Sequence, residues 1–371
     1  MSQQATSSLS SIDDLDMIVD GDSHVTESVE AVLPYMDENK YGAVKELISQ
    51  SDIPLTEIFS ATLATPAFPY TENKDVFGGV LEPEDKLEQL DEFGIDYSIL
   101  DPTTFAILPT VNNSRFAVAL AEAYNSWIVD HFLDEHERLK AALIVAPQKP
   151  SKAAEEIHRV GDEDDFVGVQ LPATGLVPPP GHEQYKPIYE AAQEYDLPIM
   201  MHSGGAQSTK VFPVQYQWNE TYAADHALSH PWTHMWNMTS LLYEGIPERF
   251  PDLEFIFQEA GIGWIPYMMW RLDDHYLEMS YEIPALEKLP SEYIRNQFYF
   301  TTQPLGHVPD NPKYIADMIE MVGPDRIMYS ADIPHPDFDP PEELFGHIHN
   351  YLDDDDVRAV MGETAADLYG F

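Results

Sequence analysis

Short apolar runs that alternate with longer amphipathic stretches constrain the fold of this chain most strongly. Eight runs have the length and composition of buried strands, at residues 17–23, 96–101, 140–146, 166–171, 198–202, 254–259, 297–302 and 326–331. Helical patterns lie between them, for example at residues 83–93, 114–131, 153–160, 185–195, 239–244 and 312–321. This alternation is typical of a parallel sheet covered by helices. Eight repeats predict an α/β fold, the closed (β/α)8 or TIM barrel.

The same pattern predicts the domain organisation. We expect a flexible leader over residues 1–16 and one domain over residues 17–371. The stretch from Thr26 to Gly79 departs from the alternation, and we expect an insertion after the first strand that folds over the barrel mouth. An open doubly wound sheet is the alternative fold, but no G-x-G-x-x-G motif follows the first strand.

The charge balance restricts the partners of the protein. The chain has 65 Asp and Glu residues against 19 Lys and Arg residues, a formal net charge of −46. Because apolar segments recur along the chain, the acid excess predicts a solvated surface rather than disorder. Such a surface is typical of a halophilic protein, since high salt screens self-repulsion; the alternative is an acidic protein of an ordinary cytosol. The charge excludes nucleic acid and anionic membranes as expected partners.

Further composition limits the chemistry and the location. The chain has no cysteine, which excludes disulfides, thiolate metal sites and cysteine nucleophiles. The polar N-terminus has no apolar core of a signal peptide, and no run approaches the ~20 apolar residues of a membrane span. We therefore expect a soluble cytoplasmic protein.

Residues that can bind a metal ion stand at the ends of four predicted strands. Asp22 and His24 end the first strand, His202 the fifth, Glu259 the sixth and Asp332 the eighth. The carboxyl ends of barrel strands converge on one face, and residues two apart on a strand share a side. Each residue alone has an ordinary explanation, such as a turn cap, but together they predict a site for one divalent ion. Oxygen and imidazole donors suit Zn²⁺ or Mn²⁺.

Other histidines are weaker candidates. His226, His230 and His234 recur every four residues, which would align them on a helix, but Pro231 argues against an uninterrupted helix there. His230 is the best candidate among them for a role in a substrate loop, against surface or packing roles. His335, three residues after Asp332, either lines the mouth as a substrate-binding residue or caps the loop.

An aromatic run follows the sixth predicted strand. Trp264, Tyr267 and Trp270 lie where the next helix is expected to begin. We expect these side chains to pack that helix against the barrel.

Several longer motifs together resemble one family. They are YNSWIVD, HERLKAALIVAPQKP, YEGIPERFPDLEFIFQEAGIGWIP, MYSADIPHPD and MGETAADLYGF. The chain is identified by them as a member of the amidohydrolase-related family of metal-dependent TIM barrels, over about residues 17–371. That family includes aminocarboxymuconate-semialdehyde decarboxylase and γ-resorcylate decarboxylase.

The resemblance implies a ligand set and a dimer. It implies Asp22, His24, His202 and Asp332 as metal ligands. Many members have His-x-His in the first motif, whereas the Asp-x-His of this chain resembles the carboxylate-x-His variants, which include γ-resorcylate decarboxylase. Glu259 stands where some members have a histidine, so that histidine's role does not transfer. The resemblance also implies a homodimer.

Two reactions of a small-molecule substrate fit one metal ion. In hydrolysis the ion activates a water that attacks a carbonyl, and Asp332 accepts its proton. In non-oxidative decarboxylation an acid protonates carbon as CO₂ leaves. The prediction is a metal-dependent hydrolase with Asp332, Glu259 and His230 as catalytic residues. The alternatives are a decarboxylase of an aromatic or unsaturated acid and, in another class, a non-catalytic barrel that only binds a ligand.

Overall fold

The barrel predicted from the sequence is present. The computed structural model describes residues 8–49, 82–134, 136–203, 222–308, 311–335 and 338–371. Eight parallel strands form one sheet in sequence order. They are β1 (Val19–Val25), β2 (Tyr97–Pro102), β3 (Leu139–Ile144), β4 (Phe166–Gln170), β5 (Ile199–His202), β6 (Phe255–Gln258), β7 (Phe298–Thr301) and β8 (Ile327–Met328).

Backbone hydrogen bonds between β1 and the segment after β8 bring the two edges of the sheet together. The Gly21 amide donates to the Tyr329 carbonyl at 2.9 Å, and the Asp332 amide donates to the Asp22 carbonyl at 2.9 Å. A β-carbon at Gly21 would lie 3.2 Å from the Tyr329 oxygen, so glycine permits this close approach. The near-closed barrel confirms the (β/α)8 prediction.

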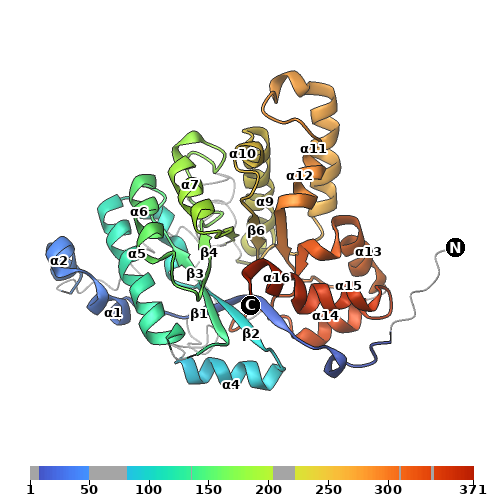
Figure 1. Cartoon of the computed structure of the whole chain (residues 1–371), viewed down its shortest axis with the longest axis horizontal. Coiled ribbons are helices and arrows are strands. Elements are labelled where there is room, and N and C mark those ends of the chain that lie inside the picture. The colour runs from blue at the N-terminus through green and yellow to red at the C-terminus, as the bar shows by residue number, and fades with distance from the viewer. Residues whose placement is uncertain (1–7, 50–81, 135, 204–221, 309–310, 336–337) are drawn as a thin grey trace.

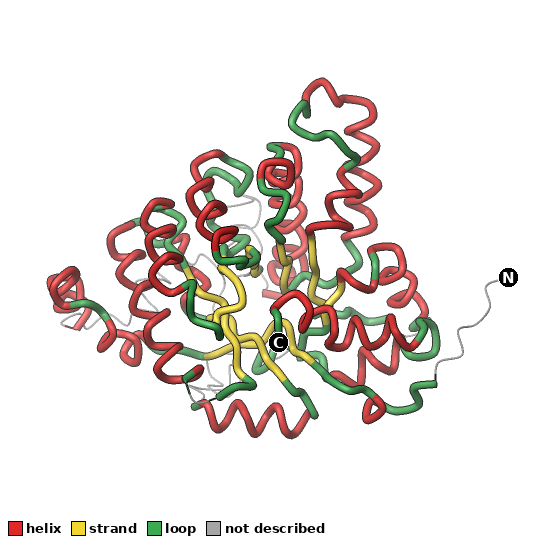
Figure 2. The backbone as a smooth tube through the Cα atoms, in the orientation of Figure 1, coloured by secondary structure: helices red, strands yellow, loops and turns green. Residues whose placement is uncertain are grey.

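Helices surround the strands on the outside (Figures 1 and 2). The main ones are α4 (Pro83–Phe93), α5 (Ser114–Ile128), α6 (Pro150–Val160), α7 (Lys186–Glu194), α9 (Tyr222–Tyr243), α11 (Ile265–Met279), α12 (Pro290–Gln297), α13 (Lys313–Val322) and α14 (Pro341–Ile348). Shorter helices are α1 (Val29–Val32), α2 (Glu38–Ser49), α10 (Ile246–Arg249), α15 (Asp354–Arg358) and α16 (Thr364–Tyr369).

Local sequence explains where a typical helix begins and ends. Helix α4 starts with Pro83, whose missing amide is no loss in the first turn. The Asp85 carboxylate reaches back and accepts a hydrogen bond from the Glu82 amide at 3.2 Å. The helix ends at Gly94, which adopts φ 66°, a conformation that favours glycine.

The barrel interior has an apolar layer at its amino-terminal end. Nearly every strand contributes a buried side chain to it: Val19, Ile99, Ala142, Val167, Met200, Ile256 and Met328, joined by Ala365 of α16. Leu368, Tyr369 and Phe371 pack against this layer, and the Phe371 ring lies 4.6 Å from that of Tyr97 at the start of β2. Helix α16 therefore closes the end of the barrel that is opposite to the strand carboxyl ends.

Two local expectations are wrong. Helix α9 runs through Pro231 without a break, because one missing amide in a helix of 22 residues is outweighed by the contacts of the rest. Trp264 is buried as expected, but Tyr267 and Trp270 are 54% and 64% exposed and do not pack on the barrel.

The stretch from Thr26 to Gly79, which the sequence predicts to be an insertion, lies partly within the described residues. Helices α1 and α2 belong to it, whereas residues 50–81 lie outside the described part, and with them the prediction of a cover over the mouth. The leader prediction likewise falls partly on residues 1–7, which are outside it. Among the helices described, none has the length and apolar character needed to cross a membrane.

Candidate metal centre

The predicted ligands converge at the carboxyl ends of their strands. Asp22 and His24 are carried by β1, where a register shift between Asp20 and Ser23 changes the facing of the side chains after it. His202 is the last residue of β5, and Asp332 follows β8. All four side chains are at most 3% exposed.

The distances among the donor atoms fit a single small cation. His24 Nε2 lies 3.1 Å from His202 Nε2 and 3.1 Å from Asp332 Oδ1. Asp22 Oδ1 lies 3.3 Å from His202 Nε2 and 3.8 Å from His24 Nε2. Donors bonded to one ion at roughly 2.0–2.2 Å stand about 3 to 3.5 Å from each other. Asp22, His24 and His202, whose donor atoms all lie within 4.8 Å of one another, therefore fit a divalent metal ion, and Asp332 lies beside them in a second group with His24 and His335.

Hydrogen bonding supports the same conclusion. His202 Nδ1 lies 2.5 Å from the Ser203 carbonyl, a contact that places the proton on Nδ1. The lone pair of Nε2 is then directed toward the centre, where it can bind a metal ion. Neither carboxylate oxygen of Asp22 accepts a hydrogen bond within the described part of the chain. A buried carboxylate without donors is costly, and a cation would satisfy it.

The electrostatics of the centre favour a positive charge. Burial alone would lower the pKa of His202, but the carboxylates of Asp22, Glu259 and Asp101 raise it well above its usual value. Burial, with His335 and His202 nearby, lowers the pKa of His24 well below its usual value. The carboxylates that draw a proton to His202 would equally attract a divalent cation, which would take the place of that proton on Nε2.

Below the donors lies a polar layer that the sequence analysis missed. Asp101 is the second-to-last residue of β2 and accepts hydrogen bonds from Gln170 at 2.7 Å and from Gln258 at 2.8 Å. Burial raises the pKa of Asp101 to about 7. Asp101 gave the same strand-end signal as the predicted ligands, so this signal could have identified it. Gln303 donates to Asp332 Oδ2 at 3.0 Å and so fixes the orientation of that carboxylate.

A buried lysine lies behind two of the strands that bear donors. Lys86 of α4 is fully buried and donates to the Ser23 hydroxyl, to the Ile333 carbonyl at 3.1 Å and to the His24 carbonyl at 3.4 Å. Burial lowers its pKa to about 8, although Asp20 and Asp332 act in the opposite direction. Lys86 thus joins the end of β1 to the segment after β8, and its position in an amphipathic helix gave no signal of this.

Glu259 and His230 form a second wall beside the centre. Glu259 Oε2 lies 3.4 Å from His202 Nε2, and Glu259 Oε1 lies 3.6 Å from His230 Nδ1. The Ser203 hydroxyl donates to Glu259 Oε2 at 3.0 Å. His226 lies one helical turn before His230, with ring centres 4.3 Å apart. Because α9 is continuous through Pro231, all of these histidines sit on a helix rather than on the loop that the sequence suggested.

His335 and two backbone conformations complete the centre. His335 Nδ1 lies 2.7 Å from Asp332 Oδ1, and its ring centre is 4.2 Å from that of His24. Glu259 and Asp332 have φ values of 56° and 62°, which non-glycine residues rarely adopt. Backbone strain of this kind concentrates at functional sites. The structure therefore brings together every residue that the sequence analysis selected.

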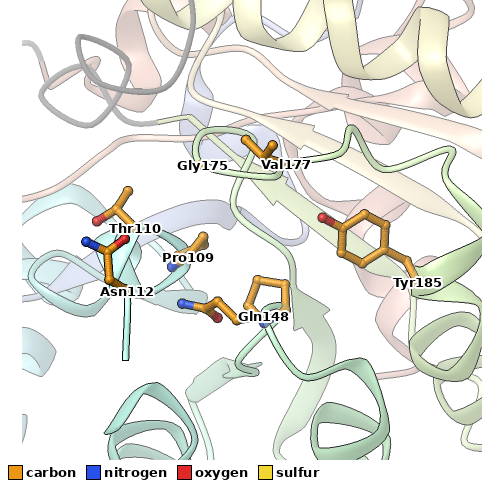
Figure 3. Close-up of a pocket in the computed structure, with 8 residues that line it drawn as sticks. Pro109, Thr110, Asn112, Gln148, Gly175, Val177 and Tyr185 are labelled. Carbon is orange, nitrogen blue, oxygen red and sulfur yellow. The ribbon is translucent and has the colours of Figure 1, made fainter. Parts of the chain in front are cut away.

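The structure also has a pocket, shown in Figure 3 with the side chains that line it. It has a volume of about 300 Å³ and is formed by the segments that follow β2, β3 and β4. Its lining is Pro109, Thr110, Asn112, Pro147, Gln148, Gly175, Val177 and Tyr185. None of the metal-binding candidates lines it, so it is separate from the centre.

Comparison with known proteins gives consistent matches. A family model described as amidohydrolase matches residues 24–371. The γ-resorcylate decarboxylase of a Polaromonas species is 26% identical over 277 residues, 70% of this chain and 79% of that protein. The 2-keto-4-carboxy-3-hexenedioate hydratase of a Sphingobium species is 28% identical over 275 residues, 70% of this chain and 74% of that protein.

A solved structure shares the fold over nearly the whole chain. It is the dihydroxybenzoic acid decarboxylase of a Polaromonas species, with bound manganese and the inhibitor 2-nitroresorcinol. The TM-score is 0.70 at 19% identity, and the match covers 96% of this chain and 97% of the other.

These matches confirm the family and the prediction of an enzyme of the hydrolase or carboxy-lyase type. They favour the decarboxylase alternative over the hydrolase that was the main prediction from sequence. They also support one divalent metal ion, while the choice between Zn²⁺ and Mn²⁺ stays a prediction.

Proposed function

Because the chain belongs to the amidohydrolase family, we propose that it is a metal-dependent, non-oxidative decarboxylase of a small aromatic carboxylic acid. The observation that carries this proposal is the position of Asp332. Its Oδ1 atom faces His24 at 3.1 Å and His335 at 2.7 Å, so one carboxylate borders both the metal centre and the residues beside it. The similarity to γ-resorcylate decarboxylases supports the same reaction.

Asp22, His24, His202 and Asp332 would hold the ion. When bound, a divalent ion would neutralise and hold the substrate's carboxylate and a neighbouring hydroxyl oxygen. The protein's own side chains then have to deliver one proton to the carbon that loses CO₂. The bond from ring carbon to carboxyl carbon breaks, its electron pair stays on the ring, and the proton takes the vacated position.

Asp332 is the proposed proton donor. Its carboxylate is held from one side by Gln303, which leaves Oδ1 directed toward the centre and His335. His335 is 13% exposed in its side chain and can pass protons between Asp332 and solvent. A donor fixed by its neighbours in this way needs little rearrangement at the moment of transfer.

Glu259 and His230 are proposed to orient the ring from the opposite wall. Glu259 lies between His202 and His230, with one carboxylate oxygen near each ring. Burial together with surrounding histidines lowers the pKa of His230 well below its usual value. A neutral imidazole beside a carboxylate can accept and return a proton of a ring hydroxyl. His335 contributes to substrate binding on the Asp332 side.

The reaction is tested with the manganese-loaded protein in high salt. Incubation with hydroxybenzoates, 2,6-dihydroxybenzoate among them, should release CO₂ in equal amount to the decarboxylated product. In D₂O the product should carry one deuterium at the vacated carbon. Lactones and an unsaturated keto-dicarboxylic acid serve as probes for hydrolysis and hydration. Turnover of those compounds with no CO₂ from any acid would refute the proposal.

Matched variants test the site. His202→Ala should reduce the metal content from about one ion per chain to nearly none, and Asp332→Asn should abolish CO₂ release. Asp325→Asn is the control, because that side chain is 71% exposed and does not belong to the metal centre. Full activity of Asp332→Asn would remove Asp332 as the proton donor. A ligand-binding barrel without catalysis would bind the acids and consume none of them.

A further inference from the structure

Three side chains beside the metal centre form a further group of possible metal donors. They are His226 and His230 of α9 and Glu259, which follows β6, and their donor atoms all lie within 4.8 Å of one another. His230 and Glu259 are 3% and 5% exposed, and His226 is partly buried. None of the three belongs to the ligand set of the first ion, so the group needs an explanation of its own.

The two histidines lie on the same side of a continuous helix. They are four residues apart, a spacing that places side chains one turn above each other, and their ring centres are 4.3 Å apart. Two histidines at this spacing can bind one ion together, with a carboxylate from another segment as the third donor. His234, the next histidine in the repeat, is engaged elsewhere, since its Nε2 atom lies 2.7 Å from the Gln258 carbonyl.

The distances around Glu259 are too long for hydrogen bonds but suit donors around an ion. Glu259 Oε1 lies 3.6 Å from His230 Nδ1, and Glu259 Oε2 lies 3.4 Å from His202 Nε2. Hydrogen bonds from nitrogen to oxygen are normally about 2.7–3.2 Å long. Two donors bonded to one ion at roughly 2.0–2.2 Å stand between about 3 and 4.4 Å apart. A cation between Glu259 and His230 therefore fits these distances better than a shared proton.

A neighbouring hydroxyl holds the carboxylate in this position. The Ser203 hydroxyl donates to Glu259 Oε2 at 3.0 Å and to the Glu259 carbonyl at 2.7 Å. This keeps Oε2 on the side of His202 and leaves Oε1 beside His230. Oriented ligands of this kind are typical of metal sites. Within the described part of the chain, the buried Nε2 atom of His230 has no hydrogen-bond partner, so the ring is available to a ligand.

The charges of the first site leave Glu259 for another cation. A divalent ion held by Asp22 and Asp332 is neutralised by those two carboxylates. His202 Nε2 carries no proton when it binds that ion, so filling the first site removes a positive partner of Glu259. The buried charge of Glu259 then needs compensation, and a cation at His230 would supply it.

We propose that His226, His230 and Glu259 form a second divalent-cation site, of the type that binds zinc. Two imidazoles and one carboxylate are the donors of zinc sites that keep an open position. The site has one carboxylate fewer than the first and one partly exposed ligand, so it fills only after the first. Its open position would accept an anionic oxygen, which favours substrates with two such groups. The site itself does not depend on the proposed decarboxylation.

The site is tested by adding Zn²⁺ to the metal-free full-length protein in high salt, which suppresses weak binding to the acidic surface. Equilibrium dialysis with elemental analysis should give about two ions per chain, bound in two steps. His226→Ala should keep the first ion and raise the dissociation constant of the second by at least about 100-fold. His275→Ala is the control, because His275 of α11 is also partly buried and lies outside the group.

An introduced thiol locates the second ion directly. The chain has no cysteine, so an absorption band from a thiolate bound to Co²⁺ can arise only at an introduced residue. His226→Cys should give this band with the second equivalent of Co²⁺, and His275→Cys should give none. Because a thiolate is also a zinc ligand, His226→Cys should recover the second Zn²⁺ that His226→Ala loses. A general loss of folding would not produce this recovery.

Three outcomes would overturn the proposal. They are saturation of the wild type at one Zn²⁺ per chain, retention of both ions by His226→Ala, and absence of the band in His226→Cys. None of these measurements uses turnover, so the two proposals can fail separately. Two ions without CO₂ release would refute the reaction alone, and one ion with CO₂ release would refute the second site alone.

Discussion

Replacing Lys86 with methionine tests how the metal centre is held in place. Methionine has a similar length and no charge, so the substitution removes the bonds from Lys86 to Ser23, His24 and Ile333 with little change in volume. The helix that carries Lys86 is otherwise unaffected, since methionine is a good helix former.

The expected loss follows from two opposing contributions. Three hydrogen bonds with a charged donor contribute about 1.5–3 kcal/mol each. Burial opposes them: lowering the pKa of Lys86 from 10.5 to about 8 corresponds to roughly 3 kcal/mol against the charged form. The difference predicts a net destabilisation of about 3 kcal/mol, with a range of about 1 to 6 kcal/mol.

Urea unfolding of the metal-free protein at pH 7 measures this loss. Calorimetric titration with Mn²⁺ measures the second effect, an expected decrease in affinity of about 10-fold or more, because the side-chain bridge between the end of β1 and the segment after β8 is lost and only their backbone hydrogen bonds remain. Lys152→Met is the control, since Lys152 is 51% exposed and pairs only with Glu155 among described residues. Unchanged stability together with unchanged Mn²⁺ affinity would show that Lys86 does not position the donors.

Three further outcomes are expected. Burial raises the pKa of Glu27 to about 8, so the folded state binds an extra proton and its stability falls as the pH rises from about 4.5 to 8. When the free energy of unfolding is measured with urea across this pH range, it should fall less steeply with pH in Glu27→Gln than in the wild type. Gly261→Ala should lower the free energy of unfolding by more than about 2 kcal/mol, because the φ of Gly261 is 63° and the new β-carbon would lie 2.5 Å from the Pro304 oxygen. The control Gly263→Ala should leave the free energy of unfolding nearly unchanged. Mn²⁺ at 100 times its dissociation constant should add about 2.7 kcal/mol and raise the melting temperature, an effect that a chelator reverses.

Sequence alone was sufficient for the barrel and for its metal-binding candidates. Each predicted strand is a short apolar run, and Asp22, His202 and Asp332 stand at or directly after the ends of such runs in the sequence. Their convergence follows from the parallel order of the strands, which the alternation with helices predicts. Asp101 carries the same signal but matched no motif, and so it was overlooked.

Other features depend on tertiary contacts that a local pattern does not contain. Lys86 occupies an ordinary position in an amphipathic helix, and its burial depends on contacts with β1 and with the segment after β8. The continuity of α9 through Pro231 depends on packing of the whole helix, which outweighs a single lost hydrogen bond. The exposure of Trp270 contradicts the prediction, because the local sequence favours burial of a large aromatic side chain.

The position of α16 has a consequence for how the protein is made. Ala365 belongs to the apolar layer of the barrel and Leu368, Tyr369 and Phe371 pack against it, so that layer stays uncovered until these residues have emerged from the ribosome. During synthesis the nascent barrel exposes an apolar opening to chaperones and proteases. Removal of the last seven residues would leave the same opening permanently, and the shortened chain should accumulate in the insoluble fraction.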